Sequence, residues 1–219
     1  ILIHNNDANL FLLNSKGFDY IDIDPFGTSN PYLEAGIKRL ARNGILAVTN
    51  TDTAALTGTY QKACVRKYWS LPKRDYRMHE TGLRILIRKI QLIGMQYEKA
   101  LIPIFSYFKD HYFRVFFQCV KSKKEADKIA KLHGMFNDAG PLWTGNLWDK
   151  GLANKMYATL LENSIKKGNI INDFNNENNN KMIFKNKKLI NKLNIKNNKI
   201  IMNNNQNYNE LLRFLKIIK

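Results

Sequence analysis

Apolar residues recur at two different spacings along the first 120 positions of the chain. Short apolar runs rich in β-branched and aromatic residues are typical of strands, and an apolar residue every three or four positions is typical of helices. In chain order these spacings predict a strand over 18–23, a helix over 31–42 that stops at Asn43-Gly44, a strand over 45–48, a helix over 78–97, and a hairpin of strands over 100–107 and 112–120. Strands that alternate with helices predict an α/β fold whose sheet closes with this hairpin.

The two ends of the chain carry weaker patterns. Residues 1–4 read as the end of a short strand, and residues 5–9 read as a polar turn. After the hairpin we expect a basic helix over 123–134, a boundary at Gly140-Pro141 and a helix over 147–166. Beyond about residue 169 the sequence is rich in Asn and Lys, and such a tract buries too little apolar surface to offset its ordering entropy. We therefore expect a disordered tail that ends in a short amphipathic helix over 209–218.

The charge of the chain is strongly positive. Lys and Arg number 35 against 18 Asp and Glu, so the net charge is +17 and the isoelectric point is near 9.8. Such an excess favours a polyanionic partner, most often nucleic acid, although part of it lies in the polar tail.

The number and placement of cysteines and histidines restrict which kinds of site the chain can form. Cys64 and Cys119 are far apart and the four histidines are scattered, so neither a disulfide framework nor a metal-ligand spacing is present. No apolar run is long enough to span a membrane, and no signal-peptide pattern occurs. We expect a reduced, intracellular protein without a metal, placed in the cytoplasm with a nuclear location left open. The chain does not begin with Met, which suggests a fragment.

The tetrapeptide Asp24-Pro25-Phe26-Gly27 follows directly on the first predicted strand, where open α/β sheets bind their ligands. One reaction that these residues could serve is the methylation of an exocyclic amine on a base. Such an amine is a poor nucleophile because its lone pair is delocalised into the ring. The Asp24 carboxylate and the Pro25 carbonyl would offer two acceptors for its hydrogens, and Phe26 would offer a ring for stacking. Gly27 would let the backbone turn. The same four residues also fit a plain strand-ending turn.

Seven sequence blocks occur in a fixed order over about residues 5–165. They are NDAN (6–9), FDYIDIDPFG (18–27), VTNTDTA (48–54), ACVRKY (63–68), HETGLRIL (79–86), DHYFRVF (110–116) and GPLWTG (140–145). Together they resemble the tRNA (guanine-26 N2)-dimethyltransferase family, whose members are class I methyltransferases with a Rossmann-like sheet that use S-adenosyl-L-methionine. The resemblance implies that the chain methylates the N2 amine of guanosine 26 of tRNA in two steps, giving N2,N2-dimethylguanosine.

The resemblance also implies roles for single residues. Asp24 would be the catalytic acidic residue, with Pro25 beside it, and Phe26 would stack on the guanine. Asp7 and Ala8 would hold the adenine of S-adenosyl-L-methionine, although by themselves they read as a polar turn.

Two groups of charged residues each allow a functional and a purely structural interpretation. Glu80 and Arg84 are four residues apart, which predicts an ion pair on a helix, and they are also candidates to line the base pocket. Arg66 and Lys67 belong to a basic cluster that either contacts RNA phosphates or forms a solvated face. The other members of the cluster are Lys73, Arg74 and Arg77.

The chain also departs from the family pattern. It opens at what would be the family's third strand, so we expect 18–23 to form an exposed apolar edge. The Gly-rich loop and the acidic residue that hold the cofactor in the family are absent from this sequence, so the chain alone need not bind the cofactor. We expect residues 1–122 to be the later part of a catalytic domain, 123–168 the start of a C-terminal α/β tRNA-binding domain, and 169–219 the tail. Two alternatives remain: a truncated remnant that binds RNA through charge, and a DNA adenine amino-methyltransferase.

Overall fold

The computed structural model describes residues 2–166 and four two-residue strands, β7 (Ile170–Ile171), β8 (Ile183–Phe184), β9 (Ile195–Lys196) and β10 (Lys199–Ile200). The chain divides into two compact units, 1–152 and 153–219. In the second unit, β7 pairs with β8 and β9 pairs with β10, both antiparallel. The predicted disorder of the tail and its terminal helix otherwise lie outside the described residues.

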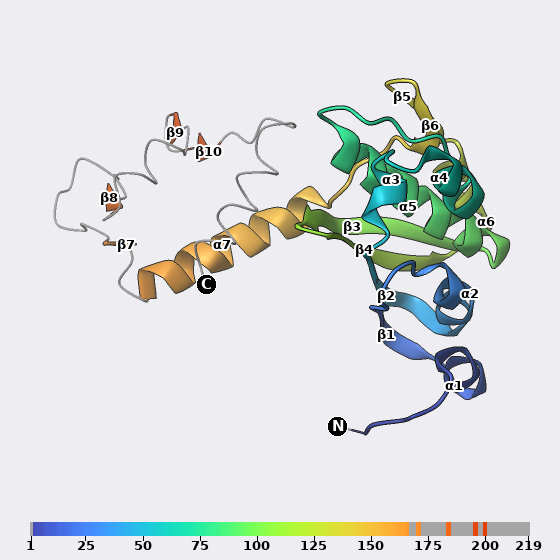
Figure 1. Cartoon of the computed structure of the whole chain (residues 1–219). Coiled ribbons are helices and arrows are strands. Elements are labelled where there is room, and N and C mark those ends of the chain that lie inside the picture. The colour runs from blue at the N-terminus through green and yellow to red at the C-terminus, as the bar shows by residue number, and fades with distance from the viewer. Residues whose placement is uncertain (1, 167–169, 172–182, 185–194, 197–198, 201–219) are drawn as a thin grey trace. The chain divides into compact units, whose positions relative to one another are not determined.

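A four-stranded sheet organises the first unit (Figure 1). Its strands are β1 (Phe18–Ile23), β2 (Leu40–Asn50), β4 (Tyr112–Lys121) and β3 (Lys99–Lys109), in this spatial order. β1 and β2 are parallel, whereas β4 runs antiparallel to both β2 and β3. The α/β fold and the closing hairpin are therefore confirmed. β1 lies at one end of this sheet, so its outer edge has no strand partner within the described part, as predicted.

Helices α2 (Asn30–Arg39), α5 (Met78–Gln96) and α6 (Lys123–Ala130) pack on the sheet and on one another. α5 lies against β3 and contributes the fully buried Ile85, Leu86 and Ile90 to the core. The 78–97 periodicity therefore predicted both the helix and its buried face.

The junction between α2 and β2 differs from the prediction. α2 ends at Arg39, and Asn43-Gly44, which read as a helix stop, lies inside β2, where the pairing with β1 shifts register. Asn43 has a φ of 62°, and a Cβ on Gly44 would lie 3.0 Å from the Asp19 carbonyl oxygen, so the pair forms a bulge within a strand. The buried Lys99 ammonium donates to three carbonyls at the end of α2, which satisfies acceptors that a helix end leaves open.

Several local expectations are wrong. Residues 2–4 form no strand, and the 5–9 turn is replaced by α1 (Ala8–Asn14), whose first turn is capped by the Asp7 side chain. The predicted 123–134 helix ends at Ala130, because the chain turns into a hairpin of β5 (His133–Phe136) and β6 (Ala139–Trp143). Gly140-Pro141, read as a boundary, lies within β6.

Three further helices complete the described part. α3 (Thr53–Leu56) and α4 (Gln61–Tyr68) follow β2 and were not predicted, and α7 (Lys150–Lys166) lies within the predicted 147–166 helix. No helix of the described residues is long and apolar enough to cross a membrane. The described residues also contain no cluster of His, Cys, Asp and Glu suited to a metal ion.

Candidate active site

Three strands bring polar residues to one edge of the sheet. β1 and β2 are parallel, so their carboxyl ends, Ile23 and Asn50, lie at the same edge. Antiparallel β4 starts at this edge, where Phe113 pairs with Asn50 and Arg114 pairs with Thr49. This is the edge at which open α/β sheets bind ligands.

The Asp24-Pro25-Phe26-Gly27 corner leaves β1 at this edge and is fixed through its glycine. The Gly27 amide donates to Thr51 Oγ1 (2.6 Å), and the Thr51 amide donates to the Gly27 carbonyl (2.9 Å). Gly27 has a φ of 85°, a conformation that side-chain-bearing residues rarely adopt. Asp24 and Phe26 are exposed, and the Asp24 carboxylate has no hydrogen bond or ion pair with other described residues.

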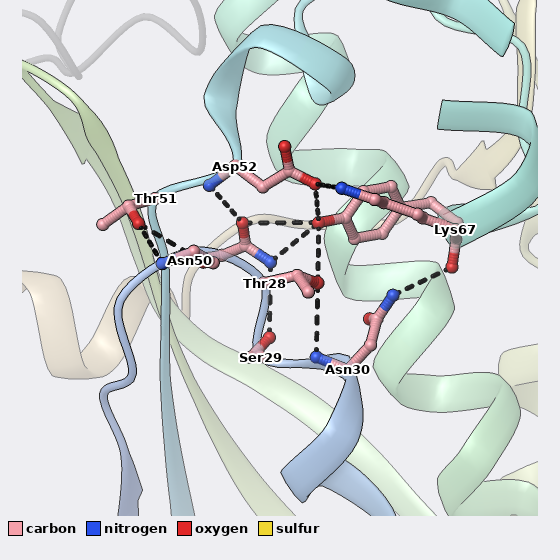
Figure 2. Close-up of polar contacts among 9 residues, drawn as sticks. Thr28, Ser29, Asn30, Asn50, Thr51, Asp52 and Lys67 are labelled. Atoms are coloured by element: carbon pink, nitrogen blue, oxygen red, sulfur yellow. Dashed lines mark hydrogen bonds and ion pairs between the residues drawn. The ribbon is translucent and has the colours of Figure 1, made fainter. Parts of the chain in front are cut away.

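A buried hydrogen-bond network lies behind the corner (Figure 2). At its centre is the phenol of Tyr68, which comes from the end of α4 and is fully buried. The Tyr68 hydroxyl donates to Asp52 Oδ2 (3.0 Å), accepts from the Asn50 amide (3.1 Å) and lies 3.0 Å from Thr28 Oγ1. The Asn50 amide also donates to Ser29 Oγ (3.3 Å). The network therefore joins the β1–α2 loop, the end of β2 and α4.

The two predicted RNA-contacting residues of α4 have different surroundings. The Lys67 ammonium pairs with Asp52 Oδ2 at 2.9 Å, and the Lys67 carbonyl accepts from the Asn30 side-chain amide at 3.0 Å (Figure 2). Arg66 is exposed and pairs with no carboxylate of the described residues. Their contact with RNA stays a prediction.

A groove of about 500 Å³ follows β1 between this strand and α1. Its lining includes Ala8 at the start of α1, Phe11 and Tyr20 along the wall, and Asp24 and Pro25 at the corner. The structure thus brings one predicted cofactor residue and two predicted catalytic residues to a single groove.

Asp7, the other predicted cofactor residue, lies beside this groove and lines a neighbouring hollow. Its Oδ1 accepts from the Leu10 amide at 2.9 Å, so its second carboxylate oxygen is the atom left to accept from an adenine amine. Ala8 lines the groove and Asp7 lines the hollow next to it, and their contact with the adenine of S-adenosyl-L-methionine stays a prediction.

A second ion pair, missed from the sequence, borders the same groove. Arg114 of β4 donates two hydrogen bonds to the Asp22 carboxylate of β1, at 2.7 and 2.6 Å, and a third to Thr49 Oγ1. The hydrogen bonds from Arg114 hold the pKa of Asp22 below its ordinary value. Burial, with smaller contributions from Tyr112 and Asp24, raises the pKa of nearby Tyr107 to about 12.

Glu80 and Arg84 form the predicted ion pair on α5, with Glu80 Oε1 3.0 and 2.9 Å from two Arg84 nitrogens. Arg84 is only 12% exposed, and its remaining nitrogen donates to the carbonyls of Trp143 (3.0 Å) and Gly145 (2.9 Å). These contacts tie α5 to the last residue of β6 and to the segment after it. A place in the base pocket stays a prediction for both residues.

Sequence reasoning therefore missed four residues that hold the corner or border the groove: Asp22, Asn50, Tyr68 and Arg114. All four lie inside the sequence blocks that carry the family resemblance. No single block indicated which residue of another block each side chain would contact. Asp22 meets Arg114, and Asn50 meets Tyr68, only through the tertiary fold.

Comparison with known proteins gives consistent matches. The family model for N2,N2-dimethylguanosine tRNA methyltransferase matches residues 1–138. The chain is 39% identical over 186 residues to the tRNA (guanine(26)-N(2)/guanine(27)-N(2))-dimethyltransferase of Aquifex aeolicus, covering 71% of this chain and 47% of that protein. It is also 39% identical over 173 residues to the tRNA (guanine(26)-N(2))-dimethyltransferase of Methanocaldococcus jannaschii, covering 70% of this chain and 46% of that protein.

A solved structure agrees in fold as well as in sequence. The complex of Trm1 from Pyrococcus horikoshii with S-adenosyl-L-methionine superposes with a TM-score of 0.67 at 32% identity, covering 73% of this chain and 48% of that chain. This likeness confirms the class I methyltransferase fold. The chain spans about half the length of the relatives it matches. Because the family model covers more than half of the chain, the chain belongs to the N2,N2-dimethylguanosine tRNA methyltransferase family.

Proposed function

We propose that this chain carries part of the active site of an enzyme that transfers methyl groups from S-adenosyl-L-methionine to the N2 amine of guanosine 26 in tRNA. The observation that carries the proposal is the convergence of Ala8, Asp24 and Pro25 on one groove at the carboxyl edge of the sheet. Family membership supplies the reaction class, since the matched relatives carry this activity in their names. A tRNA substrate fits a cytoplasmic location, with a nuclear location left open.

The chemistry assigned to the chain's own residues is the orientation of an amine. The Asp24 carboxylate and the Pro25 carbonyl accept hydrogen bonds from the two N–H groups of the guanine amine, which draws the nitrogen toward tetrahedral geometry and localises its lone pair. Pro25 has no N–H, so that position offers an acceptor without a competing donor. Preorganised acceptors of this kind act where charge develops in the transition state.

The exposed Phe26 ring stacks on the guanine once the base leaves the tRNA stack. Asp7 and Ala8 hold the adenine of S-adenosyl-L-methionine, which when bound supplies an electrophilic methyl group. The nitrogen gives up one proton for each methyl group it gains, and the Asp24 carboxylate is the group assigned to accept that proton. Two such transfers give N2,N2-dimethylguanosine.

The remaining assignments concern the RNA and the division of the chain. Arg66 and Lys67 contact phosphates, and Glu80 with Arg84 borders the base. Residues 1–122 are the later part of the catalytic domain, 123–168 begin the tRNA-binding domain, and 169–219 form a tail. Residues 123–152 belong to the same compact unit as the sheet, so such a second domain would begin packed on the catalytic one.

The test is nucleoside mass spectrometry of an unmodified tRNA transcript incubated with S-adenosyl-L-methionine. The chain alone and the complete product of the reading frame that encodes it form the two arms, with a transcript carrying adenosine at position 26 as control. Dimethylguanosine in the first transcript and none in the control is expected from the complete product. No product from either arm, with RNA affinity that falls steeply with salt, would favour the RNA-binding remnant instead.

A further inference from the structure

The loop over residues 69–77, between α4 and α5, is held rigidly on two sides. Leu71 and Gly140 exchange two backbone hydrogen bonds, of 2.9 and 2.8 Å, and Lys73 pairs with Asp138 at 3.0 Å. On its other side, a Cβ on Gly58 would lie only 3.1 Å from the Arg74 amide nitrogen, so this segment packs closely on the turn after α3. These contacts hold the loop on two sides without a ligand.

The end of this loop presents an aromatic ring to solvent. Tyr76 is 85% exposed, and the Arg77 guanidinium lies 5.3 Å from the centre of its ring. Arg77 also lies 5.7 Å from the ring of Phe136, which Arg84 contacts at 5.0 Å. The Asp75 side chain accepts from the Arg77 amide at 2.8 Å, which fixes the backbone on both sides of Tyr76.

The loop leads into a helix that contacts the sheet near the edge at which β1 and β2 end. α5 starts directly after Arg77, and His79 in its first turn stacks on Phe108, with 4.3 Å between ring centres. Phe108 pairs with Phe113, which in turn pairs with Asn50 at the carboxyl end of β2. Tyr76 thus stands three residues from a side chain anchored on the candidate active-site edge.

The charge around the ring suits a polyanion. Residues 66–77 contain five basic side chains and one acidic side chain, Asp75. Lys67 and Lys73 are paired with carboxylates, whereas Arg66 and Arg74 are exposed and pair with no carboxylate of the described residues. Exposed aromatic rings interleaved with unpaired Arg side chains are the combination that holds unstacked nucleotides.

We propose that Tyr76 is a stacking platform for an unpaired base of the RNA substrate, next to the nucleotide that is methylated. Arg77 lies against one part of the ring and the remaining exposed surface receives the base, while Arg74 contacts a neighbouring phosphate. The proposal deepens the proposed function and rests on it for the identity of the ligand as RNA. It assigns to the 69–77 loop the task of holding the strand from which the target base is extruded.

The test measures binding of the full chain to an unmodified tRNA transcript and to a 12-nucleotide single-stranded RNA, without S-adenosyl-L-methionine and over a series of salt concentrations. Tyr76→Ser is expected to weaken binding by about 5- to 100-fold with an unchanged salt slope, and Tyr76→Phe to bind like the wild type. Arg74→Gln is expected to lower the salt slope by about one phosphate contact.

Tyr97→Ser is the matched control, because Tyr97 follows the other end of α5, about 28 Å from its start. It is expected to leave RNA affinity unchanged. The proposal is overturned if Tyr76→Ser binds within twofold of the wild type, if Tyr76→Phe is as weak as Tyr76→Ser, or if the wild type binds neither RNA. Tyr76-dependent binding without any methylated product would instead count against the proposed reaction and leave the platform in place.

Discussion

Replacing Tyr68 by Phe tests whether the buried network holds the candidate active-site corner. The substitution keeps the ring in the core and removes only the hydroxyl that contacts Thr28, Asn50 and Asp52. Each of these three groups keeps another partner, because Asp52 still pairs with Lys67, the Asn50 amide still reaches Ser29, and Thr28 still accepts from the Asn30 amide. The expected cost is therefore that of the lost hydrogen bonds, with no newly isolated charge.

Two of the lost contacts are between neutral groups and contribute about 1 kcal/mol each, while the bond to the Asp52 carboxylate contributes about 2 kcal/mol. Because the remaining partners tighten around the gap, we expect Tyr68→Phe to lower the free energy of unfolding by about 3 kcal/mol. Backbone amides of the β1–α2 loop, from Gly27 to Asn30, should exchange faster as well, since the network is their link to α4.

Urea unfolding and amide hydrogen exchange measure these two effects. Tyr97→Phe is the control: it also removes a phenol hydroxyl bonded to a carboxylate, here Glu34 at 2.6 Å, but this contact is exposed and should contribute little to stability. A loss for Tyr68→Phe no larger than that of the control, with unchanged exchange in the loop, would refute the reasoning.

Three further predictions concern charged and titrating groups. Lys99→Met keeps the shape but leaves three carbonyls at the end of α2 without a donor, so urea unfolding should show a loss of about 2–4 kcal/mol. Arg114 lowers the pKa of Asp22, so this pair stabilises the fold above the pKa of Asp22 in the unfolded chain, near 4. The stabilisation is lost as pH falls through the lower pKa of the folded state, and Asp22→Asn should therefore weaken the pH dependence of stability measured below about pH 4. Burial lowers the pKa of His133 from 6.5 to about 4, so the unfolded chain takes up this proton first and stability should fall as pH drops from 6.5 to 4; His133→Gln should make that fall smaller in urea unfolding measured over this range.

The elements with strong periodicity could be predicted, and those defined by tertiary contacts could not. β1 was predicted with both of its bounds, since its aromatic and β-branched residues stand between polar turns. The first half of β2 was missed because Asn43-Gly44 is a bulge in this sheet, although the same dipeptide commonly ends helices. α4 was missed because much of its polar surface faces solvent, and only Cys64 and Tyr68 are buried.

The site residues also divide into those that local sequence could indicate and those defined by tertiary contacts. Asp24, Pro25 and Ala8 were singled out from short sequence blocks, and the fold places them along one groove. Asn50 and Tyr68 are 18 residues apart in sequence and Asp22 and Arg114 are 92 apart, so no local pattern could have paired them. For Arg84, the spacing from Glu80 predicted the ion pair but did not indicate the carbonyls of Trp143 and Gly145, which Arg84 reaches through the tertiary fold.

The measurement that tests the central claim most directly is the separate determination of turnover and tRNA affinity for Asp24→Ala in the complete gene product. If the Asp24 carboxylate orients the guanine amine, kcat for dimethylguanosine formation should fall by about 10²–10³-fold. The dissociation constant for tRNA should stay within about twofold of the wild type, because the exposed Asp24 side chain contributes no attraction to phosphate. Equal losses in turnover and affinity, or a variant that still methylates at the wild-type rate, would contradict the account.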